Sequence, residues 1–388
     1  MNLRITRREF LRVAGIAVVS TDRLFAGLRL PPDPRVARLY VGTYTKGTSE
    51  GIYCLRFDSE SGRLEVETVV KGVTNPSFLA LDRSRGRLFC VNETAEFEGR
   101  PGGYASSFAL DVDTGNVRPL NRRSTHGADP CYLTIHPDGR FVLVVNYTGG
   151  SLAVLPVGND GRLGEATDIV QHTGSSVKPR QQGPHAHSVV LDTSGRFAYA
   201  ADLGLDKVMI YRFDERAGKL IPSTPAWADL KPGAGPRHLE FSPDGSRLYV
   251  ANELDSSLTV FSLDRRTGGL EHRQTLSTLP AGFEGENFPA DVHIARSGRF
   301  VYVSNRGHDS IAAFAVETEK GVVSSVQHQP TGGTWPRNFT IDPTGAYLLV
   351  ANQRSNTITV FAIDPEAGTL APNGQSADVP SPVCLKFL

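Results

Sequence analysis

The sequence has no excess of charge of either sign, because its 41 Lys and Arg residues are balanced by 41 Asp and Glu residues. Nucleic acids and anionic membranes bind proteins through a basic face, so neither is expected as a partner. Long hydrophobic stretches are absent too, and no run is apolar enough to cross a bilayer. We therefore expect a monomeric mature protein that stays off the membrane and needs no cofactor. Any cluster of cations in it should be local and suited to one small ligand.

Cysteine is scarce, with four residues in a chain of 388. Their spacing matches neither a zinc ribbon nor a disulfide-dense scaffold. Cys90, Cys131 and Cys384 stand inside apolar runs, which favours buried free thiols over metal ligands or disulfides.

The first residues are typical of an export signal. The segment Thr6–Arg12, TRREFLR, resembles the twin-arginine motif, and the apolar stretch Val13–Val19 follows it. That stretch is far too short to span a bilayer. We therefore predict that residues 1–30 are a signal segment for the Tat export machinery and that the mature protein is periplasmic or secreted.

A repeat dominates the rest of the chain. Its units are spaced by 46–54 residues and contain an apolar run, a glycine turn and a second apolar run after each of seven prolines: Pro76, Pro130, Pro184, Pro236, Pro289, Pro336 and Pro382. A period of this size built from strands and turns is typical of propeller blades. Only six residues follow Pro382, so Arg38–Lys71 should supply the other three strands of the last blade.

The predicted fold is therefore all-β. We expect a seven-bladed β-propeller of four-stranded antiparallel blades over residues 38–388, in which the last blade is shared between the N- and C-terminal segments. Sharing a blade in this way removes the free sheet edge that a ring would otherwise expose.

Several segments of the propeller resemble the bacterial seven-bladed lactonase family. The most specific are GPHAH, GPRH, an NE pair that ends a strand, and SNRGHDSI. That family includes propeller 6-phosphogluconolactonases and the fungal carboxymuconate lactonising enzyme. The resemblance covers about residues 38–388 and implies hydrolysis of a sugar-acid lactone, with a phosphorylated lactone implied by the resemblance alone.

Counting from the turn glycines locates a site. Arg237 lies eight residues before Gly245 and Glu253 eight residues after it, so the hairpin returns both to one end of a blade. The same count brings four more side chains to that end: His187, Arg306, Arg337 and Gln353. His185 stands two residues before His187, on the same face of an extended strand. The sequence offers this histidine pair no clear third metal ligand.

These positions suggest roles in ester hydrolysis, which needs a base to activate water and cations or donors for the oxyanion. Residue types at these places also match the active-site set that the resemblance implies, which makes the catalytic candidates His185, His187, Arg237, Glu253 and Arg306. We expect Glu253 or His187 to be the general base and Arg237 with Arg306 to clamp the oxyanion or a carboxylate.

Further candidates are expected to bind substrate. They stand at the same rim, at the start of a first strand, at the end of a second strand or in the loop that follows it: Glu93, Asp202, Asn252, Asn305, His308, Arg337, Asn352 and Gln353. The Asn or Asp that ends the second strand recurs in six blades, which equally suits a cap for the following turn.

Two other functions stay open at this point. A cycloisomerase that forms a lactone from an unsaturated dicarboxylate would also need several arginines. A non-catalytic propeller that binds an exported partner is the second alternative, because fold alone does not determine function.

Overall fold

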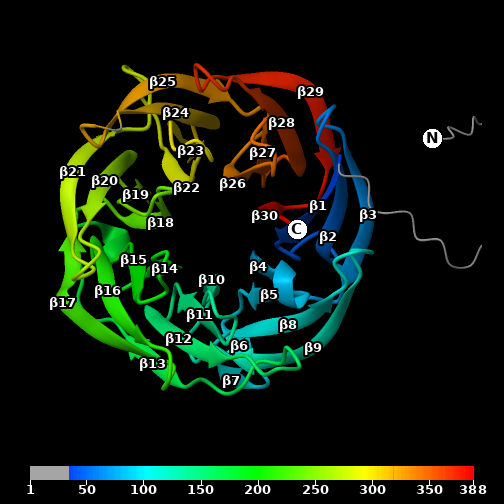
Figure 1. The fold of residues 1–388 in the computed structure, drawn as a ribbon, viewed down its shortest axis with the longest axis vertical. Coiled ribbons are helices and arrows are strands. Elements are labelled where there is room, and N and C mark those ends of the chain that lie inside the picture. Colours follow the sequence, from blue (N-terminus) through cyan, green and yellow to red (C-terminus); the bar gives the residue numbers. More distant parts are fainter. Residues whose placement is uncertain (1–34, 318) are drawn as a thin grey trace, which may run out of the picture. The chain divides into compact units, whose positions relative to one another are not determined.

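Each sequence repeat folds into one four-stranded antiparallel sheet, and seven such sheets are arranged in a ring (Figure 1). The computed structural model describes residues 35–317 and 319–388. The predicted export signal lies outside these residues. The prediction of an all-β, seven-bladed propeller is confirmed.

The strand bounds follow the repeat. From the innermost strand outward, the blade that joins the two chain ends contains β30 (Pro382–Phe387), β1 (Val36–Thr43), β2 (Gly51–Asp58) and β3 (Leu64–Lys71). The next blade contains β4 (Phe78–Asp82), β5 (Arg87–Asn92), β8 (Tyr104–Leu110) and β9 (Val117–Ser124). The third contains β10 (Pro130–Ile135), β11 (Phe141–Asn146), β12 (Ser151–Pro156) and β13 (Asp168–Gln171).

The remaining four blades follow the same order. They are β14 (Ala186–Leu191), β15 (Phe197–Asp202), β16 (Lys207–Asp214) and β17 (Lys219–Asp229); β18 (Pro236–Phe241), β19 (Arg247–Asn252), β20 (Ser257–Leu263) and β21 (Leu270–Ser277); β22 (Phe288–Ile294), β23 (Phe300–Arg306), β24 (Ser310–Glu317) and β25 (Val322–Pro330); β26 (Pro336–Ile341), β27 (Tyr347–Asn352), β28 (Thr357–Ile363) and β29 (Leu370–Asp378).

Three short elements are added to this regular pattern. A short hairpin, β6 (Glu96–Phe97) with β7 (Arg100–Pro101), lies in the loop between β5 and β8. Two single-turn 3₁₀ helices are η1 (Arg83–Arg85) and η2 (Pro179–Gln181). In the described part of the chain, no helix is long and apolar enough for a membrane span.

The chain ends close the ring as predicted. β30 pairs antiparallel with β1, with Leu39 opposite Phe387 and Val41 opposite Leu385. The C-terminal strand is therefore the innermost strand of the blade that begins at the other end of the chain (Figure 1).

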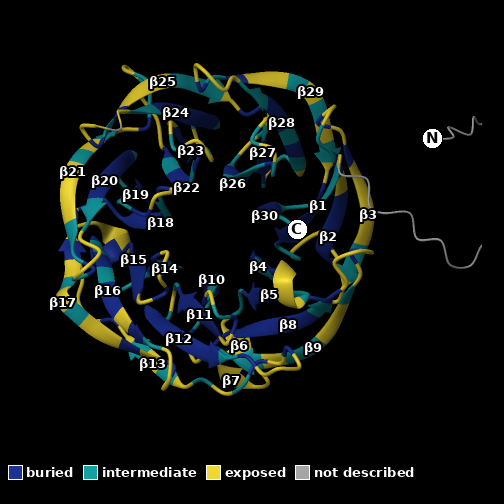
Figure 2. Ribbon diagram, viewed as in Figure 1, coloured by how far each residue is buried: buried dark blue, intermediate teal, exposed yellow. Residues whose placement is uncertain are grey.

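Apolar side chains pack between neighbouring blades. The inner strands are largely buried, whereas the outermost strands carry most of the exposed residues (Figure 2). Val41 and Leu385 of the closing blade, for example, share one cluster with Leu349 and Ile358 of the preceding blade. All four cysteines are buried and free, which confirms the expectation for Cys90, Cys131 and Cys384.

The glycine turns lie at the opposite end of the inner strands from the predicted site. In the turn from β18 to β19, the Gly245 N–H donates to the Ser242 carbonyl at 2.7 Å. Gly245 has φ 65°, so this turn needs a residue that adopts the left-handed backbone conformation, which glycine does readily. The chemistry of these turns is scaffold and leaves the other end of the strands to the long loops.

Candidate active site

β-Bulges direct one group of site residues. In β10, β14, β18 and β26 the pairing register shifts near the start of the strand, and the skipped residues are Cys131, His187, Arg237 and Arg337. A bulge leaves the extra residue unpaired and re-aims its side chain. Three of the four line one cavity, and the fourth, Arg237, contacts Glu253 in its wall.

A second group follows the second strand of several blades. The position just after the buried Asn or Thr near the end of that strand is occupied by Tyr44, Glu93, Tyr147, Glu253 and Arg306. Most residues of the two groups, together with Arg180, line a cavity of about 160 Å³. Its lining residues are Glu93, Cys131, Tyr147, Arg180, His187, Glu253, Arg306 and Arg337.

Glu253 is the centre of an ionic cluster. Its carboxylate oxygens lie 2.6 Å from Arg306 Nη2, 2.9 Å from Arg237 Nε and 2.7 Å from Arg180 Nη2. Burial alone would raise the pKa of Glu253, but the three arginines outweigh burial and hold this pKa below its ordinary value. The side chain is therefore a firmly ionised anchor for three cations.

Tyr44 links a second acidic residue, Glu93, to a fourth arginine, Arg337. The Tyr44 hydroxyl lies 2.8 Å from Glu93 Oε1, and Arg337 Nη2 lies 2.8 Å from the same hydroxyl. The cavity thus holds four guanidinium groups, counting Arg237, against two carboxylates, which leaves two formal positive charges in excess.

His187 is the cavity's imidazole. Its Nδ1 lies 3.7 Å from Cys131 Sγ, and its ring meets the Tyr147 ring edge to face at 5.2 Å. Burial, followed by the charge of Arg237, holds the pKa of His187 well below its ordinary range. The ring is therefore neutral at pH 7. Burial also raises the pKa of the Cys131 thiol, which keeps that group protonated.

The structure brings most predicted catalytic candidates together, with one exception. His187, Glu253 and Arg306 line the cavity and Arg237 stands behind Glu253, but His185 lies outside it. His185 precedes β14, stacks on Tyr147 at 4.7 Å, and its Nδ1 lies 3.0 Å from the Tyr147 carbonyl. The bulge at His187 is the reason that the His187 side chain lines the cavity and the His185 side chain does not.

Glu93 and Arg337 are the predicted substrate-binding residues that line the cavity. His308 points elsewhere, with Nδ1 2.7 Å from Ser310 Oγ and its ring against Phe283. Gln353 does not line the cavity either.

The Asn and Asp candidates for substrate binding do not line the cavity either. All four are fully buried: Asp202, Asn252, Asn305 and Asn352. Asp202 accepts from the backbone N–H of Gly204, and Asn305 Nδ2 donates to the Thr278 carbonyl. Asn252 Nδ2 donates to Ser257 Oγ, and Asn352 Nδ2 donates to Thr359 Oγ1, so each of these amides bonds to the third strand of its own blade.

Sequence reasoning missed four residues of the site: Arg180, Tyr44, Tyr147 and Cys131. Arg180 lies in η2 within the long loop after His172, and loop length was its one signal in the sequence. Tyr44 occupies the position in the closing blade that Glu93 occupies in the next, but the shared blade hid the correspondence. Cys131 stands in an apolar run that looks like ordinary core.

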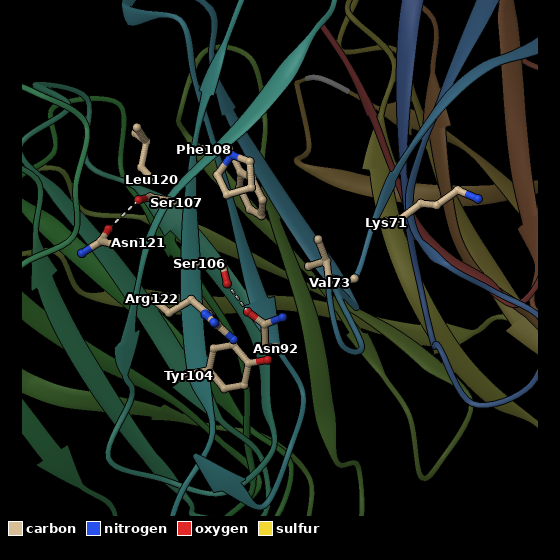
Figure 3. Close-up of a pocket in the computed structure, with 12 residues that line it drawn as sticks. Lys71, Val73, Asn92, Tyr104, Ser106, Ser107, Phe108, Leu120, Asn121 and Arg122 are labelled. Atoms are coloured by element: carbon tan, nitrogen blue, oxygen red, sulfur yellow. Dashed lines mark hydrogen bonds between the residues drawn. The ribbon is translucent and has the colours of Figure 1, made fainter. Parts of the chain in front are cut away.

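A second cavity differs in its chemistry. A cavity of about 310 Å³ lies between the loop after β3 and strands β8 and β9 (Figure 3). Its polar side chains bind each other, as in Ser106 to Asn92 at 2.6 Å and Ser107 to Asn121 at 2.7 Å. Gly47–Gly51 matches the G-x-S-x-G spelling of a nucleophile elbow, but Ser49 is buried and bonded to Thr43 at 2.6 Å.

Known proteins resemble the chain over the whole propeller. Residues 38–387 match the family model described as lactonase, 7-bladed beta-propeller. The chain is 34% identical over 349 residues to 6-phosphogluconolactonase of Bacillus subtilis, covering 90% of this chain and 97% of that protein. A 6-phosphogluconolactonase of Formosa agariphila is 33% identical over 304 residues, covering 77% of this chain and 84% of that protein.

A solved structure agrees with these relatives. The periplasmic gluconolactonase of Pseudomonas aeruginosa superposes with a TM-score of 0.86 at 39% identity, covering 91% of this chain and 99% of that one. The blade count, the lactonase-like segments and these matches lead to one conclusion: the chain belongs to the lactonase family of seven-bladed β-propellers.

Proposed function

We propose that this protein hydrolyses a sugar-acid lactone in the cavity around Glu253 and His187. The observation that carries the proposal is a neutral buried imidazole beside two positive charges in excess. A lactone is uncharged at its ester, whereas its tetrahedral intermediate and its hydroxy-acid product are anions. Such surroundings therefore stabilise the transition state and product more than the ester group.

His187 is the better base of the two candidates. The three arginines around Glu253 hold its carboxylate in the ionised form and make it a weak proton acceptor. The pKa of His187 is lowered as well, but its ring is neutral and its Nδ1 lies beside the Cys131 thiol, so it can take a proton from water while the water oxygen attacks the lactone carbonyl. When the ring C–O bond breaks, the proton passes from His187 to the ring oxygen, and the hydroxy acid is complete.

Water is the favoured nucleophile in this scheme. Cys131 is the nucleophilic type of side chain in the cavity wall, but its buried thiol has a raised pKa and little thiolate. Ser49 is tied to Thr43 in the closing blade and does not line the cavity. We therefore assign Arg306, Arg237 and Arg337 to oxyanion and carboxylate stabilisation, with Glu253 as the anchor of the first two.

A cycloisomerase is the second candidate, because two positive charges in excess also suit an unsaturated dicarboxylate. Relatives named 6-phosphogluconolactonase and gluconolactonase favour hydrolysis over this reaction.

A substrate panel tests the proposal. Purified protein is assayed with aldonolactones, with and without a 6-phosphate, and with an unsaturated dicarboxylate, by proton release and NMR of the products. We expect hydrolysis of at least one aldonolactone well above its spontaneous rate, with unphosphorylated lactones preferred by an exported enzyme. Turnover of the dicarboxylate alone would establish the cycloisomerase, and no turnover of any compound would contradict both.

We also propose that the protein is exported through the Tat machinery. The TRREFLR segment and the description of the Pseudomonas relative as periplasmic support this location. The double substitution of Arg7 and Arg8 by Lys should leave the precursor in the cytoplasm, because the twin-arginine pair is the element that the export machinery recognises. Cell fractionation and immunoblotting measure this. Unchanged recovery of the double variant in the periplasm would contradict the assignment.

A further inference from the structure

A second group of ionisable side chains lies further along the inner strands. His238 and Glu240 belong to β18, and Asp291 and His293 belong to β22. None of these four lines the cavity, and His238 and Asp291 are 4% and 3% exposed. The hydrolysis proposed above uses none of them directly. We call them the inner histidine–carboxylate cluster.

Contacts join this cluster into a continuous series that ends at His187. His238 Nδ1 lies 2.7 Å from Asp291 Oδ1. His293 Nε2 lies 3.2 Å from Asp291 Oδ2, and His293 Nδ1 lies 2.9 Å from Glu240 Oε2. At the other end of the series, the His238 ring meets the His187 ring edge to face with centroids 5.4 Å apart.

The cluster carries a negative charge. Burial alone would lower the pKa of His293, but Asp291 and Glu240 raise it to about 10, so His293 is an imidazolium. Burial and Arg237 lower the pKa of His238 to about 3, so that ring is neutral and donates its Nδ1 proton to Asp291. Two carboxylates and one imidazolium leave one negative charge in excess.

Asp291 is held in place from several sides. Besides the two histidines, it accepts from Asn338 Nδ2 and from the backbone N–H of Phe339 at 3.3 Å. Burial would raise the pKa of Asp291, but His293 and His238 hold it well below its ordinary value. The carboxylate is therefore ionised and fixed in its orientation.

In the cavity itself, His187 lies among arginines and the carboxylates of Glu93 and Glu253, and the arginines outnumber the carboxylates. Arg237 on the neighbouring strand and Arg337 both disfavour a proton on this ring. The other titratable or charged neighbours of His238 are Tyr132 on β10, whose ring lies 5.2 Å away, and Lys386 on β30. A base in this environment needs a negative charge behind it to accept a proton readily.

Building on the proposed hydrolysis, we propose that Asp291 is a positioning residue for the reaction, which orients His238 against His187 and stabilises the proton that His187 takes from water. The proton leaves again with the ring oxygen, so the step needs no further reactant. Asp291 acts through His238 and touches no reacting atom.

Asp291→Asn tests this role, because it removes the charge and nearly keeps the shape. Without that charge His187 binds a proton less readily, so its pKa falls and the acidic limb of the kcat/KM profile moves to lower pH. The plateau kcat falls by up to about tenfold for each unit by which the pKa of His187 falls, because one pKa unit is tenfold in proton affinity. KM changes little. Stopped assays from acidic to neutral pH on the best lactone of the panel measure both effects.

Asp342→Asn is the matched control. Asp342 is equally buried, but it accepts from the backbone N–H groups of Thr344 and Tyr347 in a turn at the other end of its strand. This control should lower the melting temperature without moving the pH profile. An Asp291→Asn variant that only loses stability, with kcat and acidic limb unchanged, overturns the inference.

Glu240→Gln keeps the inference testable if Asp291→Asn fails to fold. Glu240 lies at the far end of the series, is 32% exposed and contacts His293, so a smaller shift in the same direction is expected. An unshifted profile in this folded variant also overturns the inference. If the wild-type protein hydrolyses no lactone, the proposed function fails and the inference with it; if the wild-type protein is active and both variants match it, the inference alone fails.

Discussion

Replacing His187 with Gln should lower kcat by about 10²–10⁴-fold, which is the usual loss when a general base is removed. Gln keeps a neutral polar group of similar reach, and the ring's neighbours Cys131 and Tyr147 retain their own packing. The melting temperature should therefore fall by far less than the activity. Steady-state kinetics on the best lactone and a thermal unfolding curve of the same preparation measure the two effects.

His185→Gln is the matched control for this substitution. The two histidines are two residues apart and contact the same tyrosine, but only the His187 side chain lines the cavity. We expect the control to keep most of the wild-type kcat. A larger loss in His185→Gln than in His187→Gln would exchange the roles of the two histidines and contradict our assignment of the base.

Deleting residues 381–388 should abolish cooperative folding or sharply lower the melting temperature. The deletion removes β30, exposes the paired edge of β1 and takes away the buried side chains Val383, Cys384 and Leu385. Burying one aliphatic side chain stabilises a protein by about 1.5–3 kcal/mol, and total stabilities are about 5–15 kcal/mol. The loss therefore represents a large part of the total. Far-UV circular dichroism during heating measures it.

Deletion of Leu388 alone is the control for the truncation. Its backbone N–H donates to the Arg38 carbonyl at 2.9 Å, beyond the end of β30. We expect a small change in melting temperature from this loss. Equal melting temperatures for the wild-type protein and the long deletion would show that the ring does not depend on the shared blade.

The fold could be predicted because the same pattern of strands and turns recurs in every unit of the sequence. Each unit repeats an apolar run, a left-handed glycine such as Gly245 and a second apolar run, so an error in one unit is corrected by the others. Closure followed from arithmetic, since six residues after Pro382 suffice for one strand and no more.

The site could be predicted only in part. Counting along a hairpin correctly paired Arg237 with Glu253, because both lie the same number of residues from one turn. The same counting included Gln353, which does not line the cavity, and it placed His185 and His187 on one face of a strand. A count of residues assumes an unbroken register, and the bulge at His187 breaks it.

By itself, the sequence determined the all-β class, the seven blades, their closure and the end of the propeller where charged side chains gather. These properties depend on local patterns that recur along the chain. Only the tertiary structure decided that Arg180 reaches Glu253, that Tyr44 joins Glu93 to Arg337, and that Asp291 stands behind His187 through His238. Such contacts link different blades, and the side chain that fills a space between blades leaves no periodic signal in the residues around it.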